Sequence, residues 1–299
     1  MEVTAAQVKA LREKTGAGMM DCKVALQSAN GDMEGAVKHL REKGLATAAK
    51  RAGRVAAEGV IVAQRVSSGE GVLLELNCET DFVAKTPQFS ELANQLAGVL
   101  HGLSSLEGAA DTADIDFAEK KLPNGVTVGD KIAESIAAIG ESVVPRRVAR
   151  LAPGEGKGVV GSYVHAGGKI GVLVEAKTTA TGASAEDVEK LLRDVAMQVA
   201  AANPRFARRE EIPESELEKE REIYRGQAGQ TGKPAQVVEK IVAGKLEKFY
   251  AETCLVEQEY IRDSSLTVSK LVQDVSKKVG APVEVTRFVR LQLGESSES

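Results

Sequence analysis

The chain has 299 residues, enough for two or three domains that each bury a core. Lys and Arg number 39 against 43 Asp and Glu, and this net charge of -4 argues against the basic face that nucleic-acid binding requires. Aromatic residues make up 3% of the chain and Trp is absent, so few rings are available for base stacking. We therefore expect several modules and no direct nucleic-acid ligand.

The cysteines and the apolar segments restrict the cellular location. Cys22, Cys78 and Cys254 lie far apart, without the close pairs of a zinc site or the even number of a disulfide framework, and we expect reduced structural thiols. No apolar run approaches the roughly 18 residues of a membrane span, and no signal-peptide core follows Met1. We expect a cytoplasmic protein that does not bind membranes.

The first helix is predicted from its ends. Thr4 and Gln7 have capping-box spacing, and Val8 and Leu11 follow on one helical face. Gly16 is typical of the residue that ends a helix.

Two more helices complete a predicted domain. One covers about 21–29, and the other begins after Asp32, a capping residue, and is expected to stop at Gly44. Residues 48–54 are basic with few large apolar side chains, so we expect a solvated connector or a helix with little to bury. Residues 1–54 are thus predicted to be a three-helix domain and its linker.

The chain beyond residue 55 contains an internal repeat. Residues 58–60 reappear at 157–159, and 71–75 reappear at 171–175. In each copy two β-rich runs flank a Gly-rich turn, which predicts matching hairpins, and a helical stripe follows.

The two copies also end alike. Segments around Thr127, Gly140 and Arg147 recur 140 residues later, so each copy is predicted to end with a helix and a strand. The offset has grown from 100 to 140, so the second copy holds an insertion of about 40 residues.

The insertion, residues 206–251, is predicted to be an antiparallel coiled-coil hairpin. Leu217 and Tyr224 lie one heptad apart, residues 226–232 supply a polar turn, and a second apolar stripe ends at Phe249. Each arm is expected to be roughly 20 to 30 Å long.

The predicted fold is therefore α+β, with a small three-helix N-terminal domain, a duplicated α/β core with small antiparallel sheets, and the inserted hairpin. We divide the chain as follows: 1–54, the helical domain and linker; 55–152, core repeat one; 153–205 and 252–294, core repeat two; 206–251, the hairpin; and 295–299, a disordered tail.

Several apparent catalytic signals lack their context. The G-x-G-x-x-G pattern at 156–161 needs a strand before it and a helix after it, whereas the repeat makes it the opening of a hairpin strand. His39 and His101 fit solvated helix positions, and a Cys78 and His165 nucleophile pair has no third group to orient it. We expect no cofactor, no bound metal and no enzymatic activity.

One segment breaks the symmetry of the duplication. Thr80, Asp81, Phe82 and Val83 follow the second strand of copy one, whereas residues 180–183 of copy two are Ala, Thr, Gly and Ala. This difference favours a functional segment. The alternative is that Phe82 and Val83 are core residues and that Asp81 caps a turn.

Two further positions are candidates for contact with a partner. His165 replaces the Val66 of copy one at a hairpin tip, where an ordinary exposed residue is the alternative. Met19 and Met20 follow a Gly-containing loop, and methionine is an adaptable contact residue; core packing of one of them is the alternative.

Four segments carry a resemblance to a known family. They are 11–23, 77–84, Gly140 and Glu141 with 146–148, and His165 with 170–174. In these segments the chain resembles bacterial elongation factor Ts, the guanine nucleotide exchange factor for elongation factor Tu. The resemblance implies a ubiquitin-associated-like N-terminal domain, a duplicated core and a protruding coiled coil.

The resemblance also implies a mechanism and a partner, the GTPase elongation factor Tu. Asp81 and Phe82, with Thr80 and Val83 beside them, would enter the GTPase near its magnesium site and dislodge the metal. Arg12, Met19 and Met20 would hold its nucleotide domain, and His165 would contact it from the second repeat.

Other outcomes stay open at this point. Many members of the family continue past the last strand into another helix, whereas this sequence ends at Ser299, so that contact is not implied here. The alternative function is a partner-binding or chaperone-like protein that grips the same GTPase without exchange. A homodimer through the hairpin is the alternative to a monomer.

Overall fold

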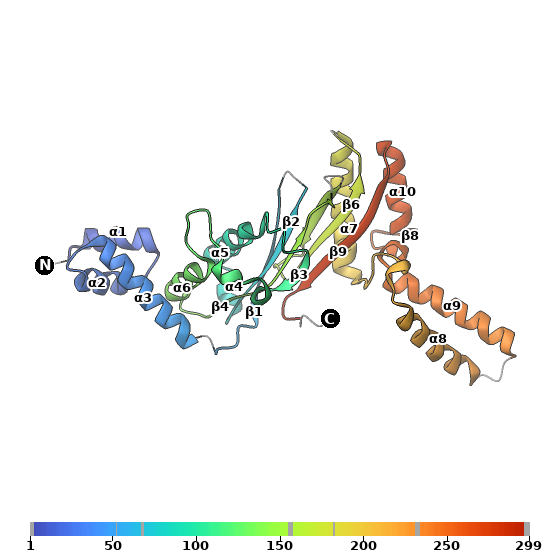
Figure 1. The fold of residues 1–299 in the computed structure, drawn as a ribbon, viewed down its shortest axis with the longest axis horizontal. Helices are drawn as coiled ribbons and strands as arrows, with labels where there is room; N and C mark the ends of the chain where they lie inside the picture. Colours follow the sequence, from blue (N-terminus) through green and yellow to red (C-terminus); the bar gives the residue numbers. More distant parts are fainter. Residues whose placement is uncertain are drawn as a thin grey trace.

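The computed structural model describes residues 3–51, 53–66, 69–154, 158–181, 183–230 and 234–295. The molecule is elongated, with three helices at one end, two sheets in the middle and a helical hairpin at the other end (Figure 1). This confirms the α+β class. No helix in the described ranges is both long enough and apolar enough to cross a membrane. Parts of two predicted turns (67–68 and 231–232), the start of the G-x-G-x-x-G pattern (156–157) and the tail residues 296–299 lie outside the described residues.

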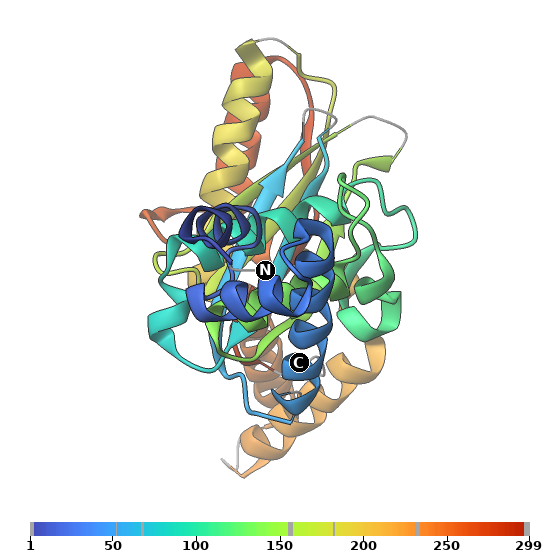
Figure 2. The ribbon, with the colours of Figure 1, turned by 90° about the vertical axis from the view of Figure 1, so that its left-hand side faces the viewer.

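The N-terminal helices are α1 (Ala5–Thr15), α2 (Met19–Ser28) and α3 (Met33–Arg51). Thr4 and Gln7 form the predicted capping box, and Gly16 ends α1 in the left-handed region with φ 68°. Figure 2 views this three-helix unit end on, in front of the sheets. Its small core contains Val8, Leu11, Cys22, Ala25, Leu26 and Ala36.

Helix α3 does not stop at Gly44, so that prediction is wrong. The helix continues to Arg51, and Gly44 is buried where α3 packs on α6 (Val128–Ile139). A Cβ at Gly44 would lie 3.2 Å from the carbonyl oxygen of Ala133, so the glycine permits a close helix crossing. Of the two expectations for the segment that begins at residue 48, the helix with little to bury holds for 48–51, because these residues continue α3 and only Ala48 and Arg51 are partly buried.

Both repeats contain the predicted hairpin followed by a helix and a final strand. The first sheet has the antiparallel order β1 (Glu58–Arg65), β2 (Gly71–Cys78), β4 (Val143–Leu151), β3 (Gly108–Asp111). The second has the antiparallel order β5 (Val159–Val164), β6 (Ile170–Thr178), β9 (Val283–Gln292). A short ribbon joins β7 (Glu259–Tyr260) and β8 (Asp263–Thr267).

Helices cover one face of each sheet. The first repeat contains α4 (Asp81–Ala84), α5 (Pro87–Ala97) and α6, and the second contains α7 (Ala183–Ala202) and α10 (Val268–Val279). Thr127 and Thr267 cap α6 and α10, and Gly140 and Gly280 end them in the left-handed region, as expected for two copies of one unit. Single 3-10 turns are η1 (Gly98–Leu100), η2 (Thr112–Ile115), η3 (Phe117–Glu119), η5 (Arg209–Glu211) and η6 (Leu255–Glu257).

The uncovered faces of the two sheets pack on each other around Ile61, Leu73, Ala149, Leu151, Val160, Leu173 and Leu291. A Cβ on Gly71 would lie 2.7 Å from Val160, and one on the equivalent Gly171 would lie 2.4 Å from Ile61. Both glycines are therefore required by close contact between the sheets.

Two ion pairs with buried glutamates follow the same symmetry. Arg147 donates to Glu75 at 2.7 Å, and the equivalent Arg287 donates to Glu175 at 2.6 Å. Each arginine also donates to a backbone carbonyl of the other repeat. The pairs therefore connect the two halves of the core.

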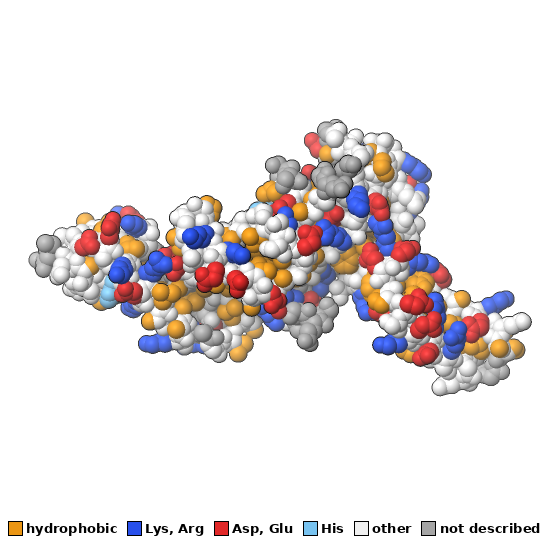
Figure 3. Space-filling view, viewed as in Figure 1, with side chains coloured by type: hydrophobic (Ala, Val, Ile, Leu, Met, Phe, Trp, Pro, Cys, Tyr) orange, Lys and Arg blue, Asp and Glu red, His pale blue; other side chains and the backbone are white. Residues whose placement is uncertain are grey.

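The insertion folds as α8 (Glu214–Gly229) and α9 (Ala235–Thr253), which run antiparallel away from the second sheet (Figure 1). At 1.5 Å per residue the helices are about 24 and 28 Å long. The turn predicted to begin at residue 226 is misplaced, since α8 continues through Gly226 to Gly229. Acidic and basic side chains are intermixed on the surface of the α8–α9 hairpin (Figure 3). Supercoiling of the pair stays a prediction.

His101 is not solvated, contrary to expectation. Its Nδ1 lies 2.8 Å from Glu70, whose carboxylate also accepts a 2.8 Å bond from Arg150. His101 follows η1 and turns inward to this acid, so its side chain is only 18% exposed. Glu295, at the start of the expected disordered tail, pairs with Arg290 at 3.2 Å.

Candidate functional site

The segment Thr80–Val83 is a short helical turn between β2 and α5. The Thr80 hydroxyl accepts a bond from Val83 N and caps α4. Phe82 is 81% exposed, so its interpretation as a core residue is wrong. Val83 does pack against the core of repeat one. The turn thus presents one large aromatic ring to solvent and is flanked by the buried residues Cys78 and Ala84.

An ion pair determines the charge beside this ring. Lys85 donates to Asp81 at 2.6 Å, one helical turn along. This bond holds the pKa of the Asp81 carboxyl below its usual range and raises the pKa of Lys85. Asp81 is therefore an anion at neutral pH, and Thr80 rather than Asp81 caps the helix.

The strand that leads into the turn ends in the core. The Cys78 thiol is fully buried and donates to the carbonyl of Thr80 at 3.2 Å. Burial raises the pKa of this thiol to about 11. A buried thiol that stays protonated near neutral pH is a poor nucleophile, which argues against the Cys78 and His165 pair.

His165 lies at the tip of the β5–β6 hairpin, where its Nδ1 is 3.1 Å from the Tyr163 hydroxyl. The imidazole is exposed, as expected. A hollow of about 520 Å³ separates this tip from the end of α4; Gly167 and Gly168 line one side, and Ala84 and Lys85 the other. The structure thus brings the hairpin tip and the Phe82 turn to opposite sides of one hollow.

Arg12, Met19 and Met20 lie together in the N-terminal unit. They line a groove of about 620 Å³ between α1 and α2, with Val8 and Lys23 beside them. Met19 is 61% and Met20 68% exposed, so the interpretation of one as core is wrong. Because α2 begins at Met19, earlier than expected, both methionines occupy its first turn. This groove is a second surface, separate from the Phe82 turn.

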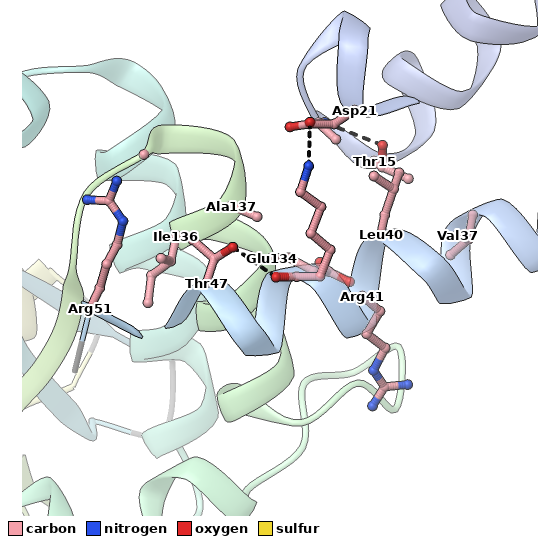
Figure 4. Close-up of a pocket in the computed structure, with 13 residues that line it drawn as sticks. Thr15, Asp21, Val37, Leu40, Arg41, Thr47, Arg51, Glu134, Ile136 and Ala137 are labelled. Atoms are coloured by element: carbon pink, nitrogen blue, oxygen red, sulfur yellow. Dashed lines mark hydrogen bonds and ion pairs between the residues drawn. The ribbon is translucent and has the colours of Figure 1, made fainter. Parts of the chain in front are cut away.

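A smaller cleft of about 200 Å³ lies between the N-terminal unit and the core (Figure 4). Its walls come from α3 and α6, and Lys43 bridges to Asp21 of α2 at 2.6 Å. Arg41 and Asp130 form an ion pair across the same junction. This cleft is the joint between the two units.

Two acidic residues at the base of the turn were not among the predicted site residues. Glu141 accepts hydrogen bonds from the backbone of Glu79 and Thr80, and Glu79 accepts one from Ser142. Comparison of the two copies could have found them, because copy two has Thr179 and Ala281 at these positions.

Comparison with known proteins identifies relatives. Residues 79–295 match the family model described as elongation factor TS. The chain is 45% identical over 299 residues to elongation factor Ts of Clostridium perfringens (strain SM101 / Type A), covering 99% of this chain and 94% of the relative. It is 46% identical over 301 residues to elongation factor Ts of Trichlorobacter lovleyi, covering 100% and 94%.

Proposed function

Because this chain belongs to the elongation factor Ts family and is a translation elongation factor, we propose that it binds elongation factor Tu in its GDP form and accelerates release of the nucleotide. GTP then rebinds and displaces the factor. The factor makes and breaks no covalent bond, so it is an exchange factor and not an enzyme.

The observation that supports this proposal most strongly is the exposed Phe82 ring next to the Asp81 anion, on a turn flanked by the buried residues Cys78 and Ala84. Phe82 wedges between side chains of the GTPase close to its Mg²⁺ site, and Asp81 anchors the wedge. Loss of the metal leaves the phosphate charges of GDP without their counter-charge, so the diphosphate leaves faster.

The other surfaces hold the partner while the wedge acts. Arg12, Met19 and Met20 grip the nucleotide domain through the N-terminal groove, and His165 contacts the partner from the second repeat. Contacts on separate surfaces of one chain make the second contact effectively intramolecular. We also propose the domain division predicted above and a cytoplasmic location, where translation takes place.

The energetics of exchange are reciprocal. If the factor weakens GDP binding by some ratio, GDP weakens factor binding by the same ratio. Each tenfold of this coupling corresponds to about 1.4 kcal/mol. The factor therefore binds nucleotide-free elongation factor Tu most tightly, and nucleotide rebinding ejects it.

Stopped-flow release of fluorescent GDP from elongation factor Tu tests the proposal. We expect the release rate to rise with the concentration of this chain and then to saturate. A complex that forms without faster release would instead support the partner-binding or chaperone-like alternative.

A further inference from the structure

Glu141 lies at the junction between α6 and β4 and holds the base of the Phe82 turn. Its carboxylate accepts bonds from Glu79 N at 3.1 Å, Thr80 N at 3.0 Å and the Thr80 hydroxyl at 2.6 Å. One side chain thus satisfies two successive backbone amides and the capping hydroxyl of α4.

Glu79 completes the arrangement in the opposite direction. Its carboxylate accepts from Ser142 N at 2.8 Å, directly after Glu141. It also pairs with Arg51 and Arg54, each at 3.2 Å. The bond from Ser142 holds the pKa of Glu79 below its usual range, so the carboxylate is ionised at neutral pH. Each glutamate therefore binds the backbone of the segment that carries the other.

Copy two of the repeat cannot build this arrangement. Strand pairing is equivalent, since Cys78 lies opposite Val143 and Thr178 lies opposite Val283. The positions of Glu141 and Ser142, however, are occupied by Ala281 and Pro282. Alanine has no carboxylate, and proline has no N–H to donate.

The repeat therefore folds this junction without the two glutamates. What copy one has in addition is the turn that carries Phe82. Its helix α4 has only four residues, too few to be stable alone, so tertiary contacts must hold the ring in place.

We propose that Glu79 and Glu141 form a reciprocal carboxylate clamp that positions the Thr80–Val83 turn for nucleotide exchange. They are positioning residues, which act through Phe82 and Asp81. Through Arg51 the clamp also connects the turn to α3, the helix of the N-terminal unit that packs on α6 of the core. This inference depends on the proposed exchange function. Pre-organisation reduces the cost of ordering the turn when the partner binds.

The decisive variant places the residues of copy two in copy one, as Glu141→Ala with Ser142→Pro. Copy two folds with alanine and proline at this junction, so we expect the variant to fold and melt cooperatively. Glu119→Ala is the matched control, since Glu119 is an exposed glutamate of the same repeat. Glu141→Gln is the conservative variant, because its amide oxygen still accepts hydrogen bonds.

The first measurement is amide hydrogen exchange of residues 79 and 80 in the isolated chain. We expect Glu141→Ala to accelerate this exchange about tenfold or more, because these amides lose their acceptor.

The second measurement is GDP release from elongation factor Tu. For the double variant we expect the maximal rate of GDP release to fall by about tenfold to a hundredfold, because a displacement of a functional group by about 1 Å can change a rate by this much. The half-saturating concentration should change less, and Glu141→Gln should recover part of the rate.

The two measurements separate the possible failures. A folded double variant with the maximal rate of the unmodified chain overturns the clamp as a positioning device. Unchanged amide exchange overturns the clamp itself. If the unmodified chain fails to accelerate GDP release, the proposed function is wrong, and the amide measurement still tests the clamp.

Discussion

Two phenylalanines, seven residues apart, have opposite environments and opposite expected roles. Phe82 is 81% exposed on α4, whereas Phe89 is fully buried in α5. An aromatic anchor at an interface can carry 2 kcal/mol or more of binding, so Phe82→Ala should reduce exchange efficiency roughly 30-fold or more. The free energy of unfolding of the Phe82→Ala variant should differ from that of the unmodified chain by only about 0.5 kcal/mol, as is usual for surface substitutions.

Phe89→Ala is the matched control. Truncation of a buried phenylalanine costs about 3–5 kcal/mol of folding stability, and exchange per folded molecule should persist. Urea unfolding and stopped-flow GDP release measure the two quantities for both variants. If Phe82→Ala lost stability while retaining exchange, Phe82 would not be the wedge.

At the scale of elements, the hairpin of α8 and α9 has its main apolar cluster at the base, although Ala228 and Val242 are also buried further out. Leu217 and Phe249 are buried at the base with Ile212 and Cys254, whereas Arg225 and Glu239 form an exposed pair near the tip. Exposed ion pairs contribute little stability. The tip is thus separable from the fold.

We predict that replacing residues 226–240 by a short Gly/Ser link, which keeps the base cluster and the Tyr224 ring packed against it, preserves exchange within about threefold, or under about 0.7 kcal/mol. Circular dichroism checks that the shortened chain is folded, and GDP release measures its activity. A folded but inactive variant would make the hairpin part of the exchange machinery. Sedimentation of the unmodified and the shortened chain tests dimerisation. If the dimer forms through the hairpin, the shortened chain should be monomeric.

At the scale of the whole molecule, each repeat holds an equivalent ion pair whose arginine also bonds to the other repeat, but the two pairs differ in their access to water. Glu75 and Glu175 are both buried, with side chains 0% and 5% exposed. Their partners differ, because Arg147 is 7% exposed and Arg287 is 38% exposed. Removal of the glutamate charge is therefore expected to reduce the free energy of unfolding by different amounts in the two repeats.

We predict that Glu75→Gln costs about 3–5 kcal/mol of unfolding free energy, because Arg147 is left as an uncompensated buried charge. Glu175→Gln should cost less, since Arg287 reaches solvent and retains a pair with Glu107 at 2.5 Å. Urea unfolding of the two variants provides the comparison. Equal losses, or a larger loss in repeat two, would contradict this assignment.

The orientation of the N-terminal unit depends on Gly44, which lets α3 approach α6. A leucine there is a better helix former by about 0.8 kcal/mol, so Gly44→Leu should keep α3 helical and push it away from α6. We expect a changed small-angle scattering profile and a raised half-saturating concentration for GDP release. Glu42→Leu adds the same side chain at an exposed position of α3 and should change neither.

The helix ends that were predicted wrongly lie at glycines, because glycine occurs both at the end of a helix and inside one. Gly16 and Gly140 do end helices with positive φ, whereas Gly44 and Gly226 lie inside them. A glycine that ends a helix and one that admits a neighbouring helix look the same in a local window. For Gly44, the distinction requires Ala133, a residue of a helix that is remote in sequence.

The sequence by itself determined both ends of α1, the two hairpins, the duplication and the position of the insertion. These features rest on local backbone preferences and on comparison of one segment with another. Only the tertiary structure decided that Phe82, Met19 and Met20 face solvent, and that Glu79 and Glu141 hold each other's backbone. Exposure and long-range hydrogen bonds depend on which surfaces meet, and segments more than 60 residues apart meet only when the chain has folded.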